Sequence, residues 1–218
     1  MKNMLSLIAF LSFFNFASGQ STNQNTMSVK IDGTEYNTQP RQIRFGAYAY
    51  FTGNATKPDR MLRIWVGNFY GTDNTEEGDY LIVNANNPDT KETIKRAQDF
   101  GKFKGIAAIR YVEETRTPRM EYHVGDSKNN DEVLTLKIGK DGFLEFKFNS
   151  QLEGTYWKEK ATATAFGGLG RIKDKIESKV ITQATGFDNN IDPEGNGYKR
   201  QDKKDVIELT EGIMRFKK

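Results

Sequence analysis

The sequence has no cysteine and only one histidine, His123, among 218 residues. Without cysteine the chain can form no disulfide, and it has no residue to carry the lipid that anchors bacterial lipoproteins. A zinc site built from histidine and cysteine ligands of one chain is also excluded, because such a site needs several of them. The stability of the protein must therefore come from its hydrophobic core.

A strong net charge is absent as well. The chain carries 32 Lys and Arg against 29 Asp and Glu, and removal of an N-terminal signal would take away only Lys2. The densest basic stretch, 91–104, is interrupted by Glu92 and Asp99, which a phosphate-binding face avoids. We therefore expect no nucleic-acid partner.

The only long apolar run lies at the N-terminus. Lys2 precedes the apolar segment 5–16, and Ala17-Ser18-Gly19 supplies the small residues that signal peptidase reads. The run of about 12 residues is shorter than the roughly 20 that a transmembrane helix needs, although an uncleaved anchor is the alternative. We predict a signal peptide at 1–19 and a disordered polar leader at 20–27. The remainder would be exported to the periplasm or the exterior, without a lipid anchor or a transmembrane span.

Alternation with a period of two residues dominates the rest of the chain. The segment 42–51 reads as one strand with one apolar face, and the segment 62–67 alternates in the same way. Turn-forming residues at 52–59 predict that these two strands form a hairpin, and Asp141-Gly142 predicts a tight turn. Further strands are predicted at 28–31, 79–83, 105–112, 120–124, 133–138, 143–148, 154–157, 162–166 and 206–209.

Many short strands joined by glycine-rich turns predict a mostly β protein, an antiparallel sandwich or a partly open barrel with one or two short helices. A capping pattern at Asp89 and Glu92, followed by Gly101, predicts a helix at 90–100. Apolar residues at helical spacing predict a second helix or an irregular segment at 169–180. The simplest organisation is a single domain over 28–218, with a long insertion at 167–205.

Several strand segments share a rhythm in which glycine precedes an aromatic residue or closes a strand, at 29–36, 78–82, 152–156 and 207–214, and the strand segment 62–65 precedes the second of them. In this rhythm the sequence resembles a family of small exported bacterial β-domains of unknown function. The segments 84–104 and 167–205 depart from the short loops of that pattern. The resemblance implies a fold and an exported location, and it implies no activity.

The predicted hairpin carries the most informative cluster of side chains. If its apolar face is buried, its outer face collects Arg44, Tyr48, Tyr50, Arg63 and Trp65. Aromatic rings beside guanidinium groups can stack on a sugar or an apolar ligand and bond its rim. We predict a ligand-binding surface here. The alternative is that a helix or a loop, for example the 90–100 segment, covers this face and makes it a second core layer.

A polar loop near the C-terminus suggests a cation site. Asp188, Asn190, Asp192 and Glu194 place oxygen atoms at alternating positions, as calcium loops do. The loop departs from an EF-hand, because Pro193 replaces the turn glycine and Lys199 replaces the closing glutamate. A solvated polar loop without a metal is the alternative.

No catalytic motif is present, and His123 is predicted to be a solvated residue on the polar face of its strand. We therefore predict a non-enzymatic, exported module that binds a glycan, a peptide or an envelope protein and needs no cofactor other than possible calcium. The alternative is a secreted hydrolase of the glycoside type, in which two carboxylates from different strands lie roughly 5 to 9.5 Å apart.

The export signal makes a direct prediction. Expression of the full chain in a bacterium should yield an exported protein whose first residue is Gln20, because cleavage is expected after Gly19. Mass spectrometry of the protein from the periplasm and the medium checks this. Retention of residues 1–19 in the purified protein would contradict it.

Overall fold

The fold is described by a computed structural model for residues 24–45, 48–55, 60–86, 88, 91–116, 120–160, 193 and 197–218. Within these ranges the chain forms strands and one short helix. The elements are β1 (Thr26–Ile31), β2 (Thr34–Thr38), β3 (Arg41–Phe45), β4 (Tyr48–Ala55), β5 (Arg60–Gly67), β6 (Gly78–Val83), α1 (Lys91–Asp99), β7 (Gly105–Arg116), β8 (Glu121–Ser127), β9 (Val133–Ile138), β10 (Phe143–Glu159) and β11 (Tyr198–Lys217). The prediction of a mostly β protein with a short helix is confirmed.

All strands belong to one sheet with the order β2-β1-β11-β10-β9-β6-β7-β5-β4-β3. The strand β8 lies off this path, between β10 and β7. The first part of β10 pairs with β9, and its second part pairs with β8. The sheet is therefore wider by one strand at the β9 end than at the β8 end.

Several predicted strands are longer in the structure than their apolar alternation indicates. The predicted strands at 143–148 and 154–157 are parts of the one long strand β10. The strand β11 begins at Tyr198, inside the predicted insertion, and β1 begins at Thr26, inside the predicted leader. In each case pairing with a neighbouring strand extends the structure beyond the apolar alternation.

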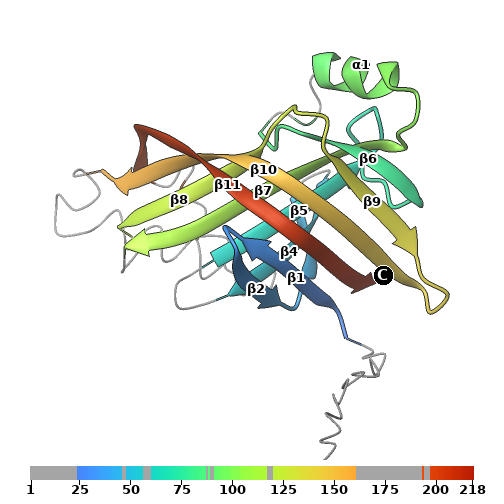
Figure 1. Cartoon of the computed structure of the whole chain (residues 1–218), viewed down its shortest axis with the longest axis horizontal. Helices are drawn as coiled ribbons and strands as arrows, with labels where there is room; N and C mark the ends of the chain where they lie inside the picture. Colours follow the sequence, from blue (N-terminus) through green and yellow to red (C-terminus); the bar gives the residue numbers. More distant parts are fainter. Residues whose placement is uncertain are drawn as a thin grey trace, which may run out of the picture.

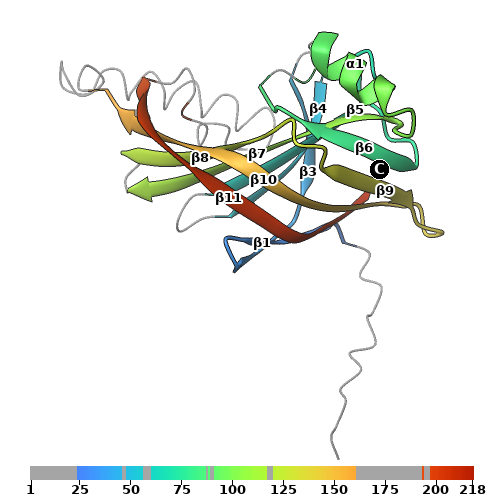
Figure 2. The same ribbon diagram turned by 45° about the horizontal axis from the view of Figure 1, so that its top comes forward.

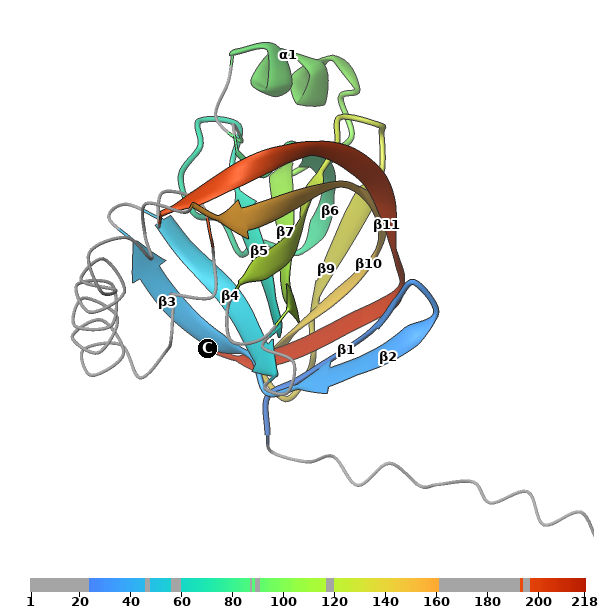
Figure 3. The same cartoon turned by 90° about the vertical axis from the view of Figure 1, so that its left-hand side faces the viewer.

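The sheet coils strongly, as Figures 1 and 2 show, and its strands curve around a common interior (Figure 3). Apolar side chains from nearly every strand fill this interior. They include Met27, Val29, Phe51, Leu62, Ile64, Tyr80, Ile109, Leu136, Phe146, Leu152, Ile207, Leu209 and Met214, all 2% exposed or less. This continuous core takes the place of disulfides in stabilising the chain.

Side chains, and not backbone pairing, bring the edge strand β2 against β4. The Tyr36 hydroxyl donates to the Gly53 carbonyl at 2.7 Å, and the Thr38 hydroxyl donates to the Asn54 carbonyl at 2.6 Å. Gly53 permits this approach, because a Cβ at this position would lie 2.3 Å from the Thr38 methyl group. The sheet therefore curls around on itself, but backbone hydrogen bonds do not close it into a barrel.

The predicted single strand at 42–51 is wrong. Phe45 and Tyr48 are register partners, so β3 and β4 form an antiparallel pair and the chain reverses between them. Ile43 consequently lies opposite Tyr50 and packs in an outer cluster, whereas Phe51 packs in the interior. Alternation alone cannot reveal such a reversal, because the apolar residues keep the same spacing on both sides of it.

The predicted helix at 90–100 is confirmed as α1, which ends before Gly101 at a φ of 65°. Thr93 and Ala97 are its buried residues. It is the only helix in the described ranges, and its nine residues are too few and too polar to cross a membrane. The predicted strand at 162–166 and the predicted segment at 169–180 lie outside the described residues.

The contact between Tyr36 and β4 can be tested by removing one hydroxyl group. Tyr36→Phe should lower the free energy of unfolding by about 1–3 kcal/mol, because it leaves the buried Gly53 carbonyl without its donor. Urea denaturation measures the change. Tyr70→Phe is the matched control, since Tyr70 is 82% exposed, and an equal effect in both variants would contradict the role of this contact.

Candidate functional site

The predicted aromatic surface is partly assembled, and its tryptophan is buried. Tyr50 and Trp65 are register partners on β4 and β5, and the Arg63 guanidinium lies 5.2 Å from the centre of the Tyr50 ring. Trp65 is only 1% exposed, and it packs in a cluster with Ala97 of α1 and residues of β6 and β7. The alternative, a second core layer beneath the helix, describes Trp65, whereas Tyr50 and Arg63 are half-buried.

Asp73 explains why Trp65 is held inside. Its carboxylate accepts hydrogen bonds from the Trp65 indole at 3.0 Å and from the Ala49 amide at 2.9 Å. Arg44 reaches the same carboxylate at 3.3 Å and is the register partner of Ala49, so it does not share the face of Tyr50. Of the predicted ligand-binding residues, Tyr48 is placed only by its backbone, at the start of β4.

The predicted calcium ligands Asp188, Asn190, Asp192 and Glu194 lie outside the described residues. Within the described part of the chain, no group of three or more acidic or histidine side chains could hold a metal ion.

A different group of residues crosses the sheet at the end where β10 terminates, on the left in Figure 1. Arg60 on β5 lies opposite Glu113 on β7. His123 on β8 lies opposite both Glu113 and Tyr156 of β10. We call Arg60, Glu113, His123 and Tyr156 the polar row. It brings one cation, one carboxylate, one imidazole and one phenol into register across adjacent strands.

The polar row lies on the inner face of the coiled sheet. On β5 and β7 it lies two positions from the interior residues Leu62 and Tyr111, which fixes the same face by alternation. On β8 and β10 the polar row lies on the same face as Gly125 and Leu152. Leu152 belongs to the interior core, and a Cβ on Gly125 would lie 2.9 Å from a Leu152 methyl group, so this face is also the inner one. In Figure 3 this end of the sheet faces the viewer.

His123 is anchored by Asp205 of β11. Its Nε2 atom lies 2.8 Å from one Asp205 oxygen, and the Tyr156 hydroxyl donates to the other oxygen at 2.6 Å. The imidazole and phenol rings also stack, with centres 4.3 Å apart and planes 7° apart. The prediction that His123 is solvated is wrong, because the residue is 9% exposed and faces inward.

Gly154 makes room for this pair. It is the register partner of Asp205, and a Cβ at this position would lie 1.8 Å from the Asp205 carboxylate and 2.7 Å from His123 Nε2. Asp205 can therefore lie across the strand to reach the imidazole. Sequence reasoning missed Asp205, although its spacing to Ile207 and Leu209 marked it as a carboxylate in the register of buried residues.

The surroundings shift the pKa values of Tyr156 and Asp205 in opposite directions. Burial, together with hydrogen bonding to Asp205, raises the pKa of Tyr156 to about 12. Although burial opposes it, hydrogen bonding to Tyr156 and His123 lowers the pKa of Asp205. The phenol is therefore neutral and the carboxylate ionised at neutral pH. Because an ionised carboxylate can only accept, His123 Nε2 carries the proton of their hydrogen bond.

Arg60 lies at the opposite end of the polar row, beside two tyrosines. Its guanidinium carbon is 5.2 Å from the centre of the Tyr36 ring, and this ring makes an edge contact with Tyr111 at 6.5 Å. Its Nε atom is buried and has no hydrogen-bond partner in the described ranges. Burial and the nearby Glu113 carboxylate raise the pKa of Tyr111, which keeps its hydroxyl protonated.

Comparison with protein families, with curated proteins and with solved structures found no match to this chain. The resemblance to exported β-domains stays a prediction. The site must therefore be interpreted from its own chemistry. The polar row can bind charged and hydroxyl groups and can move a proton, and it contains no serine or cysteine nucleophile.

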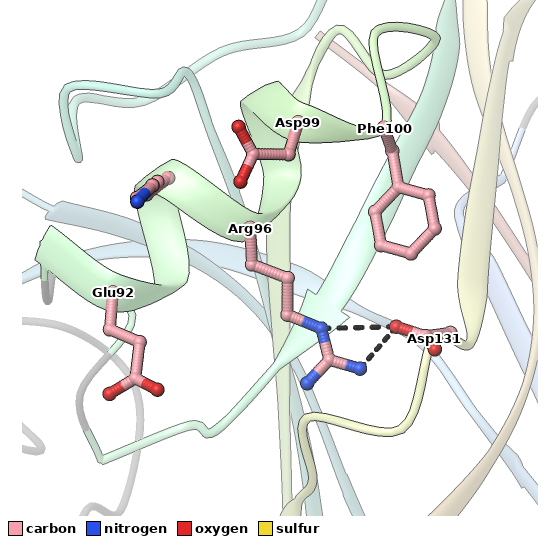
Figure 4. Close-up of a pocket in the computed structure, with 6 residues that line it drawn as sticks. Glu92, Arg96, Asp99, Phe100 and Asp131 are labelled. Atoms are coloured by element: carbon pink, nitrogen blue, oxygen red, sulfur yellow. Dashed lines mark hydrogen bonds and ion pairs between the residues drawn. The ribbon is translucent and has the colours of Figure 1, made fainter.

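An open depression of about 490 Å³ lies beside α1 (Figure 4). Arg96 points from the helix to Asp131, with its Nε 3.0 Å from the carboxylate, and it also donates to the Asn129 carbonyl at 2.8 Å. These bonds tie α1 to the segment between β8 and β9. The depression is thus a consequence of how the helix is attached, and the polar row is the stronger candidate.

The hydrogen bonds to Asp205 predict a dependence of stability on pH. Asp205→Asn should lower the free energy of unfolding by about 1–2 kcal/mol at pH 7, because it weakens the two bonds to the carboxylate. A lowered folded-state pKa stabilises the protein above the unfolded value of about 4, and this stabilisation disappears as the pH falls through the folded value. Denaturation at pH 7 and pH 3 should show a smaller difference at pH 3.

The exposed Asp202, three residues earlier on β11, provides the matched control. Asp202→Asn should change stability little at either pH. A loss in Asp205→Asn that is the same at both pH values would contradict an ionised Asp205 carboxylate in the folded protein.

Proposed function

We propose that this protein is an exported, non-enzymatic binding module, and that a small ligand binds at the polar row. The observation that carries the proposal is the change of character along the inner face. The interior is apolar over most of its length, and at one end it becomes a row of ionisable and aromatic side chains in register across adjacent strands.

This end of the sheet would not need the polar cluster if its role were only structural. Burying polar groups costs free energy even when they are hydrogen-bonded, and apolar replacements of similar shape are often neutral or stabilising. His123 is nevertheless inside, with an ionised carboxylate folded over a glycine to hold it. We attribute the retention of this arrangement to ligand binding.

The chemistry of the polar row suits the ligands predicted from the sequence, which are a glycan, a peptide or a group on an envelope protein. The guanidinium and the carboxylate recognise opposite charges, while tyrosine hydroxyls can bond to sugar or amide groups. Export through the predicted signal peptide would bring the module to such ligands outside the cytoplasm. Tyr50, Arg63 and Trp65 then stabilise the fold and do not contact ligand.

A hydrolase is the second candidate, and one observation favours it. Glu113 and Asp205 come from different strands, and both carboxylates raise the pKa of Tyr156, which places their charges near one phenol. Two carboxylates in one site are the arrangement of glycoside hydrolases. Against this reading, Asp205 is already occupied by two hydrogen bonds within the protein.

Thermal denaturation with a panel of neutral oligosaccharides, short peptides and amino acids tests the proposal. A ligand that binds only the folded protein raises the midpoint of unfolding, and at a given concentration a tighter ligand raises it more. We expect at least one class to stabilise the wild type and Glu113→Gln to weaken its binding about tenfold or more. Glu77→Gln is the matched control, because Glu77 is exposed and lies outside the polar row.

Two outcomes would overturn the proposal. One is the absence of any shift across the panel, and the other is a shift that Glu113→Gln leaves unchanged. Release of sugar from an oligosaccharide, lost in both Glu113→Gln and Asp205→Asn, would replace the binding role with hydrolysis.

A further inference from the structure

We infer that the ligand of the polar row is a free α-amino acid, whose carboxylate binds Arg60 and whose ammonium group binds Glu113. This inference rests on the binding function proposed above and names its ligand class. The structural basis is two opposite charges that lie side by side on the inner face and have no ion-pair partner among the described residues.

Arg60 and Glu113 are register partners on β5 and β7, on the same face of the sheet. Neither makes an ion pair with another residue of the described ranges, and Arg60 Nε is buried without a hydrogen-bond partner. An N–H group of a charged side chain that is buried without a hydrogen-bond acceptor lowers the free energy of unfolding. A ligand carboxylate would supply the missing acceptor, and guanidinium groups bind carboxylates through two parallel bonds.

The surroundings orient Arg60 for this role. The Tyr36 ring lies against its guanidinium group, with 5.2 Å between the guanidinium carbon and the ring centre. Tyr36 is itself fixed by its hydrogen bond to Gly53. A guanidinium held on an aromatic ring keeps its planar edge free for a carboxylate.

Glu113 is the carboxylate left for the ammonium group. The other acid of the site, Asp205, already accepts one hydrogen bond at each oxygen, from His123 and from Tyr156. Among the residues that the structure describes, Glu113 has only the neutral Tyr111 hydroxyl as a hydrogen-bonding neighbour. An ammonium group would therefore find its negative partner on β7 and not on β11.

An amino acid carries its ammonium and carboxylate groups on one Cα, so the nitrogen and the carboxylate carbon are about 2.5 Å apart. Such a ligand can contact Arg60 and Glu113 at the same time, because these two side chains start opposite each other on neighbouring strands.

Calorimetric titration of the full exported chain with glycine and the common L-amino acids tests the inference. We expect the amide and the N-acetyl derivative of the tightest-binding amino acid to bind at least tenfold more weakly than the amino acid itself. The amide lacks the carboxylate charge, and the N-acetyl derivative lacks the ammonium charge. Arg60→Gln should bind the amino acid and its amide equally well, and Glu113→Gln should bind the amino acid and its N-acetyl derivative equally well. Arg44→Gln is the control for loss of a cation, since the Arg44 side chain is 68% exposed.

The outcomes separate this inference from the binding function itself. If an oligosaccharide or a peptide binds in a manner that depends on Glu113 and no amino acid does, the inference fails and the binding function stands. If nothing binds, both fail. If Arg60→Gln and Glu113→Gln affect stability non-additively in the free protein, the two side chains neutralise each other, and the inference is overturned.

Discussion

The antiparallel pairing of β10 with β11 is the interaction on which the rest of the fold depends. These strands have 17 and 20 residues and pair along most of their length. The outer edge of β11 receives β1, while the outer edge of β10 receives β9 and then β8. Because one edge of β10 pairs with β9 and then with β8, the sheet is wider at one end and coils. Its inner face forms the hydrophobic core of a protein that has no disulfides.

The same pairing creates the candidate site. Coiling brings β5, β7, β8, β10 and β11 around one end of the interior (Figure 3). The register of these strands places the polar row and Asp205 on their inner face. Gly154 lets Asp205 cross from β11 to the histidine of β8. A backbone register set by long-range hydrogen bonds thus decides which titratable groups meet, and a shift of one residue would send them all to the other face.

Two aspartates illustrate the difference between a structural and a candidate functional polar group. Asp73 binds the Trp65 indole and a backbone amide, and it thereby satisfies donors of a layer that α1 covers. Asp205 instead holds His123 of the polar row, in which Arg60 and Glu113 are without ion-pair partners in the described ranges. The first arrangement is complete within the protein, whereas the second leaves charges available to a ligand.

The sequence by itself determined the mostly β class, the helix near 90–100 and most strand positions, because these depend on local periodicity and on capping residues. It also identified Tyr50, Arg63 and Trp65 as one face. Only the tertiary structure decided that Trp65 on this face is buried, that 42–51 contains a reversal, and that His123 faces inward. These features depend on which strands pair and on what covers them, and such contacts join residues far apart in the chain, whose spacing in the sequence carries no record of the register.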